Sequence, residues 1–210
     1  RLGLGEGPVV AVLPGSRLGE VRRLGAAFAG AMAWLHERRP QVQFVAPMAS
    51  AKARALFEGA LQAHAPRVRA QLVDGQAQHA LAAADAVLVA SGTATLETAL
   101  SKRPMVVAYR LHPLTAWLVR RFNVMKTQYF SQPNLLAGRA LVPEFMQEQA
   151  TPAALGAALL DQLENTARRA ELAAAFETIH HRLRRDASQR AAEAVTALLE
   201  DTALRGSGGP

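Results

Sequence analysis

The sequence contains no cysteine, and aromatic residues make up only 5% of it. Without cysteine the chain can form no disulfide bond, no thiolate metal site and no cysteine nucleophile, and this composition fits a cytosolic protein. No secretory signal pattern is present, and no apolar run has the length of a transmembrane helix. The six histidines lack the spacing of metal ligands, so we expect neither a metal site nor a cofactor.

Several well-known motifs are missing as well. There is no Gly-x-Ser-x-Gly elbow, no Walker loop and no Rossmann Gly-x-Gly-x-x-Gly, which argues against a hydrolase, an ATPase and a dehydrogenase. No zinc-finger, RRM or KH signature accompanies the basic residues, so we expect no nucleic acid among the partners.

The length allows one domain with appendages, because 210 residues, 50% of them hydrophobic, can bury a core of that size. The first residue is Arg1 rather than methionine, and a strand pattern begins almost at once, at Val9. We therefore expect a piece of a longer protein whose N-terminal part is missing.

The formal net charge of +7 is unevenly distributed. Between Thr98 and Pro143 there is no acidic residue, but there are seven basic ones: Lys102, Arg103, Arg110, Arg120, Arg121, Lys126 and Arg139. Such a block favours an anionic partner, either phosphates or anionic lipid headgroups. The alternative is a generally arginine-rich composition with a solvated surface.

Apolar runs typical of buried strands alternate with segments of helical periodicity. Strands are expected at Val9–Leu13, 42–46, 69–73, Ala86–Ala90 and Met105–Tyr109, and helices after Arg17 to about 38, at Ala51–His64, 76–84 and 93–101. This order predicts an α/β fold, a doubly wound parallel sheet. In such sheets ligands bind beyond the carboxyl ends of the strands.

Two turns fall at that edge. Ser91, Gly92 and Thr93 lie between a strand and a helix, where small residues and free backbone N–H groups favour an anion. Glu97 follows one helical turn later and could accept hydrogen bonds from ribose hydroxyls, although a solvated helix face is the commoner role.

The second turn is Pro14-Gly15-Ser16-Arg17, which offers N–H groups, a hydroxyl and a permanent cation to a phosphate. The alternative is an ordinary strand-to-helix turn, with Gly15 present for its backbone conformation and Ser16 as the helix N-cap. Because both turns lie at the same edge, we interpret them together as a site for a nucleotide diphosphate.

The pattern changes beyond Arg110. A short helix at 114–122 mixes apolar and cationic residues, which suits either an anionic membrane surface or a packed helix with a basic rim. A long polar run from Lys126 to Glu144 is predicted to be an irregular, functional loop. We expect a nucleotide-binding domain over 1–150, then helices over 151–204 that pack on the domain or on a partner subunit, with breaks near Asn165 and Asp186, and a disordered tail over 205–210.

Three segments together resemble one family. They are Leu13-Pro14-Gly15-Ser16-Arg17 with Glu20, then Ala90-Ser91-Gly92-Thr93-Ala94-Thr95-Leu96-Glu97, and above all Gln132-Pro133-Asn134-Leu135-Leu136-Ala137-Gly138-Arg139. The likeness runs from about Val9 to Leu199. The chain resembles lipid-A-disaccharide synthase, a glycosyltransferase of the GT-B fold, and it resembles the C-terminal half.

The resemblance implies an enzyme that transfers the diacylglucosamine unit of UDP-2,3-diacylglucosamine to lipid X and releases UDP. It implies a location in the cytoplasm, peripheral on the inner face of the inner membrane, with an anionic membrane surface as a partner. It also implies a separate N-terminal acceptor domain, which would hold the catalytic base, and a homodimer that exchanges C-terminal helices. By this account the isolated chain is inactive, and it contains no catalytic residue.

The resemblance also implies roles for individual residues. Ser16, Arg17 and the 91–93 turn would stabilise the charge on the departing UDP, while Glu97 would hold the ribose. Asn134 and Arg139 would contact the diphosphate or the sugar from the facing loop. Two alternatives stay open: a related GT-B enzyme such as a UDP-N-acetylglucosamine 2-epimerase, and a non-catalytic nucleotide-binding module.

Overall fold

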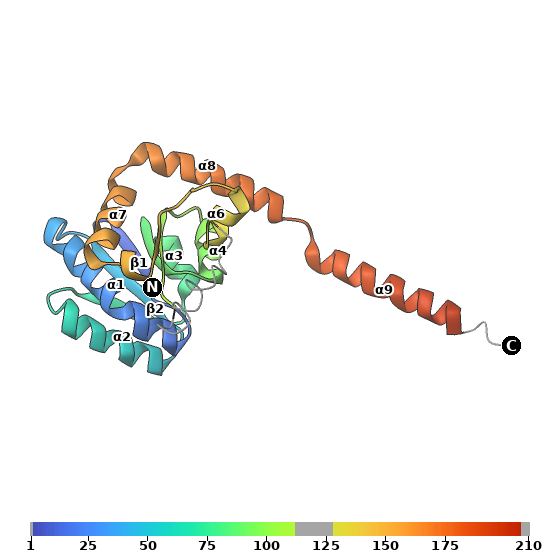
Figure 1. Cartoon of the computed structure of the whole chain (residues 1–210), viewed down its shortest axis with the longest axis horizontal. Coiled ribbons are helices and arrows are strands. Elements are labelled where there is room, and N and C mark those ends of the chain that lie inside the picture. The colour runs from blue at the N-terminus through green and yellow to red at the C-terminus, as the bar shows by residue number, and fades with distance from the viewer. Residues whose placement is uncertain (1, 112–127, 207–210) are drawn as a thin grey trace.

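The computed structural model describes residues 2–111 and 128–206 (Figure 1). At its centre is a sheet of six parallel strands in the order β3-β2-β1-β4-β5-β6. The strands are β1 (Val9–Leu13), β2 (Gln43–Met48), β3 (Ala70–Asp74), β4 (Ala86–Ala90), β5 (Met105–Tyr109) and β6 (Glu144–Met146). The predicted doubly wound parallel sheet is therefore confirmed.

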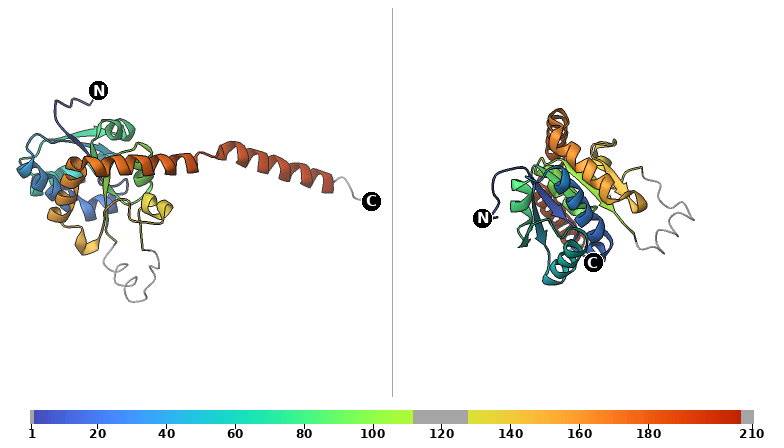
Figure 2. Two further views of the ribbon diagram at one scale, coloured as in Figure 1. Left: turned by 90° about the horizontal axis from the view of Figure 1, so that it is seen from above. Right: turned by 90° about the vertical axis from the view of Figure 1, so that its left-hand side faces the viewer.

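Helices lie on both sides of the sheet (Figure 2), and each face of the sheet has its own hydrophobic core. On one face Val10 and Val12 of β1 pack with α1 (Leu18–Arg38), α2 (Ala51–His64) and α7 (Pro152–Glu164). On the other face Val9, Ala11 and Leu13 pack with α3 (Ala77–Ala83), α4 (Thr93–Leu100) and α8 (Thr166–Leu183). Successive side chains of a strand point to opposite faces of the sheet. Because both faces are buried, the strands read as unbroken apolar runs.

The helix α7 crosses α1 at close range. A Cβ atom on Gly156 would lie 2.5 Å from the ring of Trp34, so a larger residue there would force the two helices apart. This contact holds α7, which follows β6 in the sequence, against α1. Helix α7 begins with Thr151 as N-cap, whose hydroxyl accepts a hydrogen bond from Ala154 N at 3.2 Å, followed by Pro152 in the first turn.

The C-terminal helices are interrupted at the two places that were predicted. Asn165 caps α8 by accepting from Arg168 N at 3.0 Å, and Asp186, with a φ of 47°, separates α8 from α9 (Ala187–Gly206). Helix α9 projects away from the body of the molecule (Figure 1). It includes residues 205 and 206, which were expected in the tail, and the rest of that tail lies outside the described residues.

Two short elements were not predicted. The segment expected to be irregular contains α6 (Gln132–Ala137), and β6 adds a sixth strand at the edge, parallel to β5. The prediction of Ser16 as N-cap was wrong, because Arg17 takes that position. The helix predicted over 114–122 lies outside the described residues. Within 2–111 and 128–206, no helix combines the length and apolarity needed to cross a membrane.

Candidate functional site

A cavity of about 530 Å³ opens at the carboxyl ends of β1 to β4. Its walls are the turns and helix starts that follow these strands: Gly15, Ser16, Arg17 and Glu20 after β1, Pro47 to Ala49 at the end of β2, Gly75 and Ala77 after β3, and Ser91 to Ala94 with Glu97 after β4. Gln132, at the start of α6, completes the lining. Six of the eight predicted binding residues therefore surround one cavity.

The turn after β4 leaves three backbone donors free at the start of α4. No group in the described part of the chain accepts the N–H of Gly92, Thr93 or Ala94. The turn is held by Thr95, whose N–H and Oγ1 both donate to the carbonyl of Gly92, at 3.1 and 2.8 Å. Because these N–H groups lie at the positive end of a helix, they form a place where an anion is stabilised.

The turn after β1 is arranged differently. Glu20 folds back from the first turn of α1, and its Oε2 accepts hydrogen bonds from Ser16 N at 3.1 Å and Arg17 N at 3.2 Å. Gly15 has a φ of +117°, and a Cβ there would lie 2.5 Å from Glu20 Oε2. The glycine thus gives the turn its conformation and leaves room for the carboxylate.

Arg17 extends into solvent at the mouth of the cavity, with 85% of its side chain exposed. Its nearest partner is Glu20, whose Oε1 lies 3.6 Å from a guanidinium nitrogen. An exposed ion pair of this length contributes little to stability, so the guanidinium is available to a ligand. Glu97 is exposed on α4, and its carboxylate has no hydrogen-bond partner among the described residues. Its carboxylate is likewise available.

The segment before α6 is tied to the turn after β4. Ser91 Oγ donates to the carbonyl of Phe130 at 3.1 Å, and Gln132 N donates to Thr95 Oγ1 at 3.3 Å. From the other side the carboxylate of Glu144 accepts from Ser131 N at 2.7 Å. These bonds place Gln132 in the cavity wall. Sequence reasoning did not select Gln132 as a site residue, although it opens the strongest of the family-like segments.

Asn134 was predicted to contact the ligand, and the structure gives it another role. Its side chain is 1% exposed, with Nδ2 donating to Val142 O at 2.9 Å and Oδ1 accepting from Leu141 N and Val142 N at 2.8 and 2.9 Å. It does not line the cavity. Since all its polar atoms serve the backbone after α6, Asn134 shapes the segment that leads to β6.

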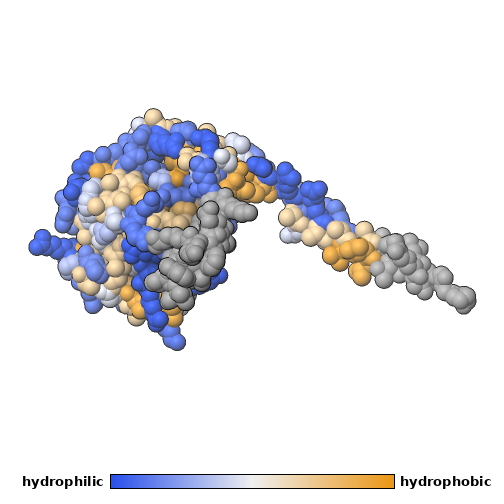
Figure 3. Space-filling view, in the orientation of Figure 1, coloured by the Kyte–Doolittle hydropathy of each residue, from blue (hydrophilic) through white to orange (hydrophobic). Residues whose placement is uncertain are grey.

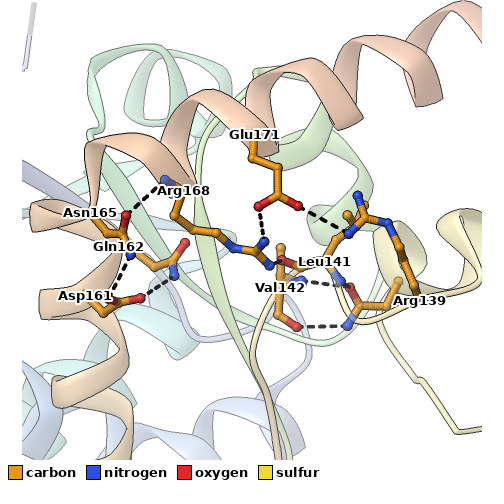
Figure 4. A network of polar contacts seen from close by, with 9 residues as sticks. Arg139, Leu141, Val142, Asp161, Gln162, Asn165, Arg168 and Glu171 are labelled. Carbon is orange, nitrogen blue, oxygen red and sulfur yellow. Dashed lines mark hydrogen bonds and ion pairs between the residues drawn. The ribbon is translucent and has the colours of Figure 1, made fainter.

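Arg139 also lies away from the cavity. Its guanidinium donates to Glu171 of α8 at 3.3 Å, and Glu171 is bound from the other side by Arg168 (Figure 4). Arg168 first, and Arg139 second, hold the pKa of Glu171 below its usual range. Arg139 follows the buried Asn134 by five residues, just after the end of α6, and its side chain reaches α8 instead of the cavity.

The cavity is bordered both by positive groups, which attract an anion, and by two carboxylates. The positive ends of α1 and α4 both face it, and Arg17 adds a full positive charge at the mouth. Glu20 and Glu97 supply carboxylates on the same wall. Among the described residues no group of three His, Asp or Glu side chains is arranged to hold a metal ion.

Comparison with protein families gives a match over nearly the whole chain. The family model of lipid-A-disaccharide synthetase matches residues 5–198. The chain is 53% identical over 195 residues to the lipid-A-disaccharide synthase of Hahella chejuensis, covering 93% of this chain and 48% of that protein. It is 54% identical over 200 residues to the enzyme of the same name from Pseudomonas putida strain GB-1, covering 95% and 52%. The chain spans about half the length of these relatives, and the matched part is their C-terminal half.

Solved structures show the same fold at low sequence identity. The calicheamicin glycosyltransferase CalG4 has a TM-score of 0.60 at 20% identity and covers 97% of this chain and 46% of its own. The UDP-GlcNAc 2-epimerase of Neisseria meningitidis bound to UDP-GlcNAc has a TM-score of 0.55 at 13% identity, covering 84% and 44%. WaaG, a glycosyltransferase involved in lipopolysaccharide biosynthesis, has a TM-score of 0.52 at 18% identity, covering 88% and 45%. The fold is thus one Rossmann-like half of the GT-B type.

Proposed function

Because the chain belongs to the lipid-A-disaccharide synthetase family, we propose that it is the nucleotide-binding half of a glycosyltransferase. The donor is UDP-2,3-diacylglucosamine, and the acceptor is lipid X, 2,3-diacylglucosamine 1-phosphate. The 2,3-diacylglucosamine unit passes to lipid X, which gives the β-1,6-linked lipid A disaccharide and UDP. Identity above 50% to synthases favours this reaction over an epimerase, to which the likeness is one of fold alone.

The observation that carries this proposal is the cavity at the carboxyl edge of the sheet. Gly92, Thr93 and Ala94, whose N–H groups have no acceptor among the described residues, line it, and Arg17 lies at its mouth. A diphosphate bound there is stabilised by donors that are already in place, and the stabilisation grows as negative charge builds on the departing UDP. Glu97, one turn into α4, is the acceptor for the ribose hydroxyls.

Ser16 and Ser91 line the same cavity but have narrower roles. Ser91 Oγ donates to Phe130 O, so that only its lone pairs remain for a ligand. The hydroxyl of Ser16 is available to a ligand, while its backbone N–H donates to the carboxylate of Glu20. Gln132 joins the binding set, because its amide can both donate to and accept from a sugar or a base.

The remaining machinery belongs to the other half of the relatives. We expect the catalytic base and most of the acceptor site there, and we expect the enzyme to work at the cytoplasmic face of the inner membrane, where acylated substrates reside. The basic stretch around Trp117 is a candidate for contact with anionic lipids, although it lies outside the described residues. A homodimer with exchanged C-terminal helices completes the proposed assembly.

Calorimetric titration of the chain with UDP tests the nucleotide site. We expect UDP to bind more tightly than UMP, because UMP lacks the second phosphate, and more tightly than ADP, which carries the wrong base. No heat with UDP at millimolar concentration, or equal affinity for ADP, would contradict the assignment.

Turnover tests the division between the two halves. We expect no disaccharide from the chain alone and measurable synthesis when the N-terminal half of a close relative is added. Robust synthesis by the chain alone would show that it holds a complete active site. UDP binding without restored synthesis would favour a nucleotide-binding module.

A further inference from the structure

The two turns that face the cavity differ in one respect that bears on how a ligand is held. The N–H groups of Gly92, Thr93 and Ala94 have no acceptor among the described residues, whereas those of Ser16 and Arg17 are bonded to the carboxylate of Glu20. Both turns have the backbone form that binds phosphates at helix starts. In the turn after β1, however, the anion that accepts from these N–H groups is the carboxylate of Glu20.

The carboxylate of Glu20 is held firmly in that position. One oxygen, Oε2, takes both N–H groups, and the other, Oε1, faces the guanidinium of Arg17 at 3.6 Å. The side chain of Glu20 is 18% exposed, and Gly15 packs directly over it, since a Cβ there would lie 2.6 Å from Glu20 Cβ. Hydrogen bonds to an ionised acceptor are stronger than neutral ones, so the carboxylate competes well with an incoming phosphate.

The neighbouring donors of α1 do not replace the two that Glu20 occupies. The N–H groups of Leu18 and Gly19 have no acceptor among the described residues, but neither residue lines the cavity. The turn after β1 therefore presents to the cavity the guanidinium of Arg17 and the hydroxyl of Ser16, and of its backbone donors only the N–H of Gly15 is left without an acceptor among the described residues.

We propose that Glu20 is a positioning residue that closes the N–H groups of Ser16 and Arg17 to the ligand and sets Arg17 at the mouth of the cavity. The diphosphate is then held by the free N–H groups at the start of α4 and by the guanidinium of Arg17. This inference rests on the proposed nucleotide site and states which backbone donors of its two turns are closed to the ligand. It also explains why an acidic residue, Glu20, lies in an anion-binding site five residues after Gly15.

The first experiment needs no ligand. Amide signals of the ¹⁵N-labelled chain are compared at neutral pH between the wild type and Glu20→Ala. We expect the Ser16 and Arg17 amide protons to move upfield in Glu20→Ala, which has lost their acceptor, and to move further than those of Leu18 and Gly19, which have no acceptor among the described residues. Amides of Ser16 and Arg17 that move no further than those of Leu18 and Gly19 would overturn the proposal.

The second experiment adds UDP at neutral pH. Saturation should move the amides of Gly92, Thr93 and Ala94 strongly, and the Ser16 and Arg17 amides should keep the difference between the wild type and Glu20→Ala. Loss of that difference on binding would show that the phosphate displaces Glu20 and would overturn the proposal. No shift at any of the five amides would instead contradict the proposed nucleotide site, while the first experiment still reports on the carboxylate.

Two variants separate positioning from general destabilisation. Glu20→Gln keeps an acceptor oxygen at the same reach, so we expect UDP affinity within about threefold of the wild type. Glu20→Ala releases the turn, and we expect affinity to fall about tenfold, the effect of losing a well-placed charged contact. A rise in affinity in Glu20→Ala would mean that the carboxylate blocks a phosphate site, which contradicts the proposal. Uridine, which lacks phosphates, should bind both variants equally.

Discussion

Arg17 is the residue through which the electrostatic part of the nucleotide site can be measured most directly. Its guanidinium is exposed at the mouth of the cavity and has only a long ion pair to Glu20, so its removal costs the fold little. We predict that Arg17→Ala weakens UDP binding by roughly 1.5–3 kcal/mol, the value of a hydrogen bond to a charged group. Isothermal calorimetry measures this difference.

Arg22→Ala is the matched control for Arg17. Arg22 is exposed on the same helix but does not line the cavity, so its loss changes the net charge without removing a contact. We expect Arg22→Ala to change UDP affinity only slightly at physiological salt, because separated surface charges are screened there. Equal effects of the two substitutions would mean that Arg17 acts through overall charge rather than by touching the diphosphate.

Asn134 shows the opposite case, a polar residue whose importance is structural. Its amide serves Leu141 N, Val142 N and Val142 O, and Asn134→Ala would leave these backbone groups unpaired in a buried place. We predict a loss of about 3 kcal/mol in the free energy of unfolding, which urea denaturation measures. Asn165→Ala, which removes an exposed N-cap, should cost about 1 kcal/mol. A stable Asn134→Ala protein that had lost UDP binding would restore the ligand role.

At the level of elements, α8 is fastened to the domain by two acidic residues. Glu177 lies 3.0 Å from Lys102, and the resulting hydrogen bond and charge hold the pKa of Glu177 below its usual range. Arg168 and Arg139 do the same for the pKa of Glu171. Lys102 and Arg139 belong to the chain around α4 and α6, so both acids join α8 to the elements beside the cavity.

The lowered pKa values predict how the attachment of α8 depends on pH. A carboxyl with a lower pKa when folded stabilises the fold above its unfolded pKa, near 4.5, and this contribution is lost as the pH falls through the folded pKa. We expect thermal stability to decrease below about pH 4.5, and to decrease less steeply in Glu171→Gln/Glu177→Gln. Melting followed by circular dichroism at several pH values measures both slopes.

Glu193→Gln is the control for that series, because Glu193 in α9 contacts the neutral Gln189 at 3.0 Å. Its acid slope should equal that of the wild type. A double variant with an unchanged slope would show that the two acids do not carry the pH dependence.

Several elements that the sequence predicted correctly have burial patterns that can be read from the sequence. The strands β1, β4 and β5 are buried on both faces and therefore read as unbroken apolar runs, and α1 shows a periodic buried stripe. β6 has three residues, all half-buried, and owes its strand form to pairing with β5. A pairing imposed by a neighbour leaves no periodicity in the sequence.

The site, too, could be predicted only in part from the sequence. The two turns could be placed at one edge because parallel strands end there. The roles of Glu20 and Asn134 could not be assigned, because a side chain that binds backbone N–H groups uses the same atoms as one that binds a ligand. Glu20 stands three residues after an N-cap, the spacing of a capping box, but an arginine occupies the place where that pattern has serine or threonine.

At the scale of the whole molecule, α9 is the feature that the fold of one chain leaves unexplained. It projects from the body with hydrophobic side chains along one side (Figure 3). Val195 and Leu199 are 57% and 66% exposed, and their spacing of four residues places them on one face. A helix of this kind is stabilised by packing its apolar face rather than by its own propensity.

We therefore predict that the chain dimerises through α9, in line with the exchange of C-terminal helices proposed for the family. Val195→Glu/Leu199→Glu should shift the protein from dimer to monomer in sedimentation experiments, because charges at the centre of an apolar contact oppose association. Ala197→Glu adds a carboxylate on the opposite face of α9 and should leave the dimer intact. Since α9 lies far from the cavity, the monomeric variant should still bind UDP, which separates loss of assembly from loss of folding. A wild-type chain that stays monomeric at high micromolar concentration, or a control that dissociates as readily, would rule out α9 as the contact between copies.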